Sequence, residues 1–186
     1  MNTMGTDTIA AWGICDKLDM LIWLLADAMG PALTTYTAQN MGAGRWDRVC
    51  KGNRIGAAMS VAAVGTVSLG LYFLTAPLGG LFVPVQDAAA VVPQAVAFMR
   101  RMAPFFLFYA LAESFSGACC GTGDTVRPMI LTLLSICLLR VLGILLVLPR
   151  QHTMECIIDI YISSWIAAGI GFLILWQWEK NRVQKT

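Results

Sequence analysis

The sequence contains few charged residues and a single histidine. Of its 186 residues only 13% are charged, whereas 58% are hydrophobic, and the mean hydropathy is +0.68. Soluble domains carry about 25% charged residues, so this chain has about half the charge that a water-exposed surface needs. The formal net charge of +2 is too small to indicate a nucleic-acid partner. The composition therefore predicts an integral membrane protein.

Sequence motifs for catalysis, metal binding or nucleotide binding are also lacking. The six cysteines show no CxxC spacing, and we expect them to be small packing residues. His152 is the only histidine, falls in a short loop and has no evident nucleophile to activate, so we expect it to be solvated. The turn Gly121-Thr122-Gly123-Asp124 lacks the strand–helix context and the Lys-Ser/Thr pair of a phosphate loop. We therefore expect no enzyme, no cofactor and no metal site.

Five apolar runs are long enough to cross a bilayer as helices, which takes about 20 residues each. The predicted spans cover about 9–39, 55–82, 103–120, 128–149 and 156–178. Pro93 and Pro104 interrupt the run before the third span, which predicts an interfacial segment there. The expected fold is all-α, a polytopic membrane helical bundle in a single domain.

Basic residues indicate how this bundle is oriented. On one side of the predicted membrane lie Arg45, Arg48, Lys51, Arg54, Arg127, Lys180, Arg182 and Lys185, and on the other lie Arg100, Arg101 and Arg150. The positive-inside rule places the first side, and with it the C-terminus, in the cytoplasm. Five spans then place the N-terminus outside, from which we expect that a preceding span is missing from the chain.

The first predicted span carries a polar face. Charged groups in a bilayer cost at least a few kcal/mol unless they face a cavity or one another. At helical spacing, Asp16, Trp23, Asp27 and Thr34 fall on one line along this span. Pro31, one turn after Asp27, is expected to free a backbone carbonyl and to bend the helix.

The third and fourth spans also carry polar groups. Tyr109, Glu113 and Ser116 share one face of the third span, and Arg140 lies in the middle of the fourth. Two interpretations stay open. Arg140 is either a fixed ion-pair or hydrogen-bond partner that holds helices together, or Glu113 and Asp27 bind H⁺ or Na⁺ in exchange for cargo. The carboxylate that pairs with Arg140 would be the poorer proton carrier.

Four segments resemble the multidrug and toxic compound extrusion (MATE) family of transporters. They are GPALTTYTAQNMGAGRWDR, FSGACCGTGDTVRPMI, LLRVLGILLVLP and YISSW, in the order and spacing of a bacterial branch of that family. The agreement extends from about residue 5 to 180. Cys120 departs from the pattern, because many members have arginine before that glycine.

The resemblance implies a fold of twelve spans in two six-helix lobes, of which residues 1–186 resemble the second, C-terminal lobe without its first span. It implies an antiporter of the cell membrane that exports organic cations and other xenobiotics, driven by H⁺ or Na⁺, by alternating access. Glu113 is the first expected coupling residue and Asp27 the second, with Asp16, Thr34, Tyr109 and Ser116 lining the cavity.

The expected partners are membrane lipid, small organic cations and either the missing N-terminal lobe or a second chain that supplies it. We expect no multidrug efflux by this chain alone. Two alternatives stay open: a flippase for lipid-linked oligosaccharides from the same superfamily, and a non-transporting remnant or assembly subunit.

Overall fold

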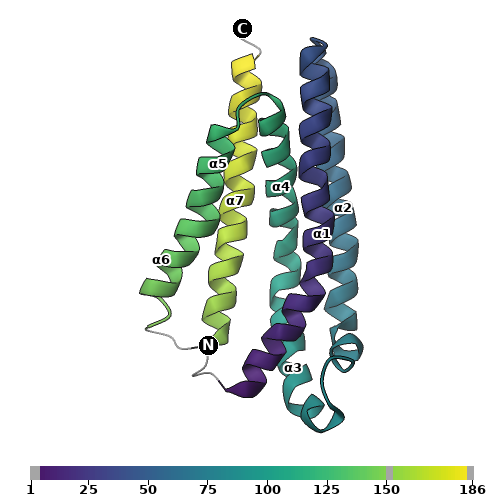
Figure 1. The fold of residues 1–186 in the computed structure, drawn as a ribbon, viewed down its shortest axis with the longest axis vertical. Helices are drawn as coiled ribbons and strands as arrows, with labels where there is room; N and C mark the ends of the chain where they lie inside the picture. Colours follow the sequence, from purple (N-terminus) through teal and green to yellow (C-terminus); the bar gives the residue numbers. More distant parts are fainter. Residues whose placement is uncertain (1–4, 150–152, 184–186) are drawn as a thin grey trace.

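The chain folds as a bundle of long helices in a computed structural model, which describes residues 5–149 and 153–183. The elements are α1 (Thr6–Gly42), α2 (Trp46–Gly79), α3 (Val85–Met102), η1 (Ala103–Phe105), α4 (Phe106–Gly121), α5 (Val126–Thr132), η2 (Leu133–Leu138), α6 (Leu139–Leu146) and α7 (Met154–Val183). The described residues contain no strand, which confirms the all-α bundle predicted from sequence (Figure 1). His152, Arg150 and Lys185 lie outside the described residues.

Four of the five predicted spans are long and apolar enough to cross a membrane. These helical segments are Trp46–Gly79, Val85–Gly121, Val126–Leu146 and Met154–Val183. The first predicted span is α1, which has 37 residues but is more polar because of its aspartates and hydroxyl side chains. An apolar helix is suited to lipid because it satisfies its own backbone hydrogen bonds.

The central helix of the bundle is α4, which packs against α1, α2 and α7. Figure 1 shows α5 and α6 running along α7 at one edge, and α1 and α2 paired at the other. The α1–α2 turn, the α4–α5 turn and the C-terminal end of α7 lie at the same end of the bundle. This is the end that carries most of the basic residues in the sequence.

Two helical segments depart from regular α-helix. The short 3₁₀ turn η1 separates α3 from α4 at Pro104, next to the predicted start of the third span. In the fourth span, η2 is a six-residue π-helical stretch between α5 and α6. In contrast, α1 continues without interruption through Pro31.

Two turns at the basic end of the bundle each contain a glycine with positive φ. Gly44 has φ +68° after α1, and Gly123 has φ +95° between α4 and α5. Only glycine adopts this left-handed region without a steric cost. The GAG and GTGD segments are therefore turns that reverse the chain, as the sequence predicts.

Candidate functional site

A carboxylate pair lies where α1 packs against α4. The Tyr109 hydroxyl donates a hydrogen bond of 2.6 Å to Asp27 Oδ1. One turn further along both helices, a Cβ added to Gly30 would lie 3.6 Å from Glu113 Oε2. The two expected coupling residues, Asp27 and Glu113, therefore lie on successive turns of one helix–helix interface.

On the next turn of α1, the hydroxyl of Thr34 connects the two helices. Thr34 Oγ1 lies 3.0 Å from the carbonyl oxygen of Gly30 and 3.0 Å from that of Gly117, so it connects α1 with α4. These contacts place Thr34 in helix packing rather than in an open cavity. Ser116 is half-buried on α4 and makes no side-chain hydrogen bond to a described residue.

An aromatic cleft opens beside this pair, between the first half of α1 and α7. It has a volume of about 740 Å³ and its charged lining residues are two carboxylates, Asp16 and Asp19, and one cation, Lys17. Asp16 is exposed, whereas Asp19 is only 7% exposed. Its aromatic lining residues are Trp12, Trp23, Tyr161 and Trp165. Aromatic faces and carboxylates together form a suitable environment for an organic cation.

Trp23 connects the cleft with the carboxylate pair. Its ring centroid lies 4.8 Å from that of Tyr109, the residue that is hydrogen-bonded to Asp27. A ligand in the cleft that moves Trp23 would therefore also move the Tyr109 ring, whose hydroxyl is hydrogen-bonded to Asp27. This gives a direct physical path between the cleft and the carboxylates.

Of the two partners predicted for Arg140, an ion pair or a hydrogen bond, the structure shows the hydrogen bond and corrects the ion pair. No described carboxylate lies within ion-pairing distance of it; instead, its Nε donates to Ser164 Oγ at 2.9 Å. Its guanidinium also lies 4.1 Å from the ring centre of Tyr161. Asp27 and Arg140 therefore have separate partners, the Tyr109 hydroxyl for the carboxylate and α7 side chains for the guanidinium. Arg140 Nη2 is buried without a hydrogen-bond partner among the described residues. Arg140 thus connects α6 with α7 by a hydrogen bond.

Replacing Ser164 by alanine is expected to weaken this α6–α7 connection. The variant leaves Arg140 Nε without its acceptor, and interhelical hydrogen bonds in membranes contribute about 1 kcal/mol. Thermal unfolding in detergent should show a lower midpoint for Ser164→Ala. Ser163→Ala is the matched control, because Ser163 is exposed and bonds only to its own helix at Asp159 O. Equal midpoints for the two variants would contradict this role of Ser164.

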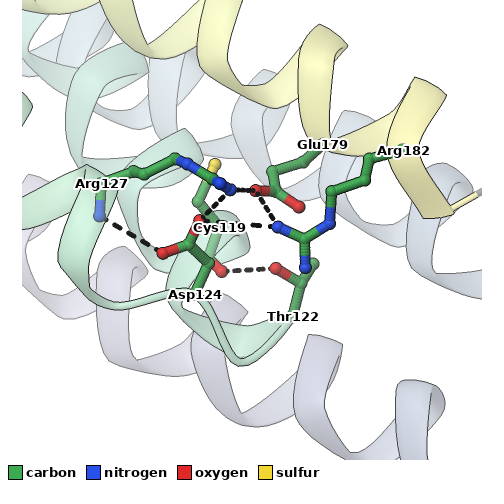
Figure 2. A network of polar contacts seen from close by, with 6 residues as sticks. All are labelled: Cys119, Thr122, Asp124, Arg127, Glu179 and Arg182. Atoms are coloured by element: carbon green, nitrogen blue, oxygen red, sulfur yellow. Dashed lines mark hydrogen bonds and ion pairs between the residues drawn. The ribbon is translucent and has the colours of Figure 1, made fainter.

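A cluster of four charged residues lies at the basic end of the bundle (Figure 2). Glu179 Oε1 is 3.0 Å from Arg127 Nη1 and 3.3 Å from Arg182 Nη1, although Glu179 itself is fully buried. Arg127 also pairs with Asp124 at 2.6 Å. The Arg127 guanidinium lies 4.1 Å from the ring centre of Trp178. The cluster therefore fastens the α4–α5 turn to the end of α7.

Asp124 is the acidic residue of the turn in this cluster. Partial burial tends to raise its pKa, but the hydrogen bonds from the Arg127 backbone N–H and guanidinium, and the positive charge of that guanidinium, outweigh this effect. The pKa of Asp124 is therefore below its usual value. The carboxylate is ionised at neutral pH and keeps its bonds to Arg127.

Sequence reasoning missed Asp19 and Glu179 as site residues. Asp19 falls beside the line drawn through Asp16 and Asp27, yet it lines the same cleft. Glu179 directly follows the tryptophans that end the last span, a position that predicts a surface residue. One of its two partners, Arg127, is 52 residues away in the sequence and gives no local signal.

Long apolar helices that enclose carboxylates beside an aromatic cleft are typical of a membrane transporter. The MatE family model matches residues 1–146, and the chain belongs to this family of transporters. It is also similar to the probable multidrug resistance protein YoeA of Bacillus subtilis (strain 168), with 19% identity over 190 residues. That match covers 100% of this chain and 40% of the relative, so the chain spans about two fifths of the relative's length.

Proposed function

We propose that the chain forms part of the C-terminal lobe of a multidrug efflux antiporter in the plasma membrane. It exports organic cations in exchange for H⁺ or Na⁺ by alternating access between two lobes. The observation that supports this most is the Asp27–Tyr109 hydrogen bond, with Glu113 one turn away and the aromatic cleft adjoining it. The resemblance of the whole chain to a probable multidrug resistance protein agrees with this function.

In this mechanism the cleft and the carboxylate pair act on each other. An organic cation enters between the aromatic rings and is attracted by Asp16 and Asp19. Through Trp23 and Tyr109 its presence changes how Asp27 is held, and H⁺ or Na⁺ binds at Asp27 or Glu113 when the cargo leaves. Pro31 has no N–H for the carbonyl oxygen of Asp27, so that oxygen is available to a cation.

The other lobe and the orientation belong to the same proposal. A second six-helix lobe, on the same or another chain, encloses the exposed side of Asp27. The basic end of the bundle, with the C-terminus, faces the cytoplasm, in agreement with the positive-inside rule. The chain acts in transport and not as an enzyme, because no nucleophile–base pair is evident in its sequence.

The proposal is tested by the binding of tetraphenylphosphonium, a lipophilic organic cation, to the purified chain in detergent. Asp27→Asn and Glu113→Gln are each expected to weaken binding several-fold, because one negative charge near the site is lost. Asp87→Asn is the matched control, since Asp87 lies in the first turn of α3, away from the site. Equilibrium dialysis gives the dissociation constants. Unchanged binding in both site variants would overturn the proposal.

Two further outcomes would identify the alternatives. Preferential binding of an undecaprenyl pyrophosphate lipid over tetraphenylphosphonium would indicate a flippase. A Glu113→Gln variant that folds in lower yield, with no ligand bound by the parent chain, would indicate a non-transporting subunit. In proteoliposomes the chain alone is expected to show no exchange of the organic cation for H⁺ or Na⁺.

A further inference from the structure

A second groove lies at the basic end of the bundle, between the start of α2 and the end of α7. It has a volume of about 470 Å³ and is separate from the aromatic cleft at the opposite end. Three cations line it: Lys51 and Arg54 from α2 and Lys180 from α7. The same surface of α2 supplies one carboxylate, Asp47. The groove therefore has more positive than negative charge.

The cations of this groove have no carboxylate partner. Among the described residues, Lys51, Arg54 and Lys180 form no ion pair. The neighbouring Arg127 and Arg182, at the same end of the bundle, both pair with Glu179. Lys180 is half-buried despite its charge. An uncompensated, half-buried cation next to a fully paired cluster indicates a site for an external anion.

The walls of the groove are apolar and aromatic. Trp46 and Ile55 flank the cations, and Ile55 is 48% exposed. The Trp46 ring lies 6.1 Å from that of Trp176, which holds it against the end of α7. Tryptophan next to lysine and arginine at the end of a span marks the headgroup region of the bilayer. A ligand of this groove must therefore be anionic at one end and apolar at the other.

We propose that this groove binds the phosphate of an anionic phospholipid. The phosphate lies among Lys51, Arg54 and Lys180, and the acyl chains lie along the apolar surface beyond Ile55. Basic pockets between transmembrane helices on the cytoplasmic side are known to hold such headgroups. The site is independent of cargo, and in the proposed orientation it faces the cytoplasmic leaflet.

The test measures lipid binding to the delipidated full chain by native mass spectrometry. Dioleoylphosphatidylglycerol should bind in preference to dioleoylphosphatidylcholine. The double variant Arg54→Gln/Lys180→Gln is expected to weaken binding of the anionic lipid by about tenfold or more, because each cation near the membrane surface adds roughly a factor of five to ten.

The matched control is Arg45→Gln/Arg48→Gln. It removes the same charge from the same end of the bundle, but neither residue lines the groove. Its affinity for dioleoylphosphatidylglycerol should stay within about twofold of the parent chain. An equal loss in both double variants would overturn the proposal, since it would show diffuse attraction to a basic surface. Equally tight binding of glycerol 1-phosphate would also overturn it, because the site would then select a free phosphate and not a lipid.

Discussion

Gly117→Ala is expected to be among the most destabilising single substitutions in this chain. An added Cβ at Gly117 would lie 2.2 Å from the carbonyl oxygen of Gly30, and neither backbone can yield without separating α1 from α4. Overpacking of this kind costs about 1–3 kcal/mol. The separation would also break the Thr34 contact with Gly117 and displace Glu113, which lies one turn earlier on α4.

Thermal unfolding in detergent, followed by tryptophan fluorescence, measures this effect. The control is Gly70→Ala, because Gly70 lies inside α2 and an added Cβ there meets nothing within 4 Å. Alanine favours a helix over glycine by about 1 kcal/mol, so Gly70→Ala should leave the midpoint unchanged or raise it. Gly117→Ala should lower it. A Gly117→Ala chain as stable as the Gly70→Ala chain would contradict the close packing of α1 and α4.

The second large effect is expected for Glu179→Ala. Glu179 is fully buried and accepts from two guanidiniums, so its removal leaves Arg127 and Arg182 without their shared acceptor. Loss of one partner from a buried pair costs about 3–5 kcal/mol. Here the two arginine side chains are 45% and 48% exposed and water can solvate them, which reduces the expected cost to about 2 kcal/mol.

The same unfolding experiment tests this prediction. Glu155→Ala is the matched control on the same helix, because Glu155 is 69% exposed and lies 3.5 Å from Arg101. An exposed pair contributes about 0–1 kcal/mol, so the control should change the midpoint little. Glu179→Gln keeps the side-chain volume and one oxygen acceptor and should fall between the two. If Glu179→Ala unfolds at the same temperature as Glu155→Ala, the cluster does not fasten α7 to the α4–α5 turn.

The bundle could be predicted from sequence because lipid imposes a simple rule on it. Runs of about 20 apolar residues must be helices, and the GAG and GTGD turns mark where the chain reverses. Helical periodicity also placed Asp27 on the polar face of the first span, and the structure shows that Asp27 meets α4. The Asp27–Tyr109 pair followed from no local pattern, because it depends on how α1 and α4 align along their lengths.

The partners of the buried charges were harder to predict. Opposite charges in one membrane suggest an ion pair, and the sequence left open whether Arg140 forms an ion pair or a hydrogen bond. The structure shows that Arg140 instead donates to a serine and lies against two aromatic rings, all on α7. Hydroxyls and rings are common along every span, so sequence alone does not single them out. Of the two partners of Glu179, Arg182 is three residues away on α7, whereas Arg127 is 52 residues away and meets Glu179 only through the fold.

The π-helical stretch η2 determines the direction in which Arg140 points. One π-helical turn acts as an inserted residue, so every side chain after it is rotated by about 100° relative to an uninterrupted α-helix. Leu133–Leu138 ends two residues before Arg140. A helical wheel that uses 3.6 residues per turn for the whole fourth span therefore places Arg140 on the wrong face of α6. The six residues of η2 make no polar contact with α7 themselves. They nevertheless set which face of α6 is turned toward α7, and so they decide whether Arg140 reaches Ser164.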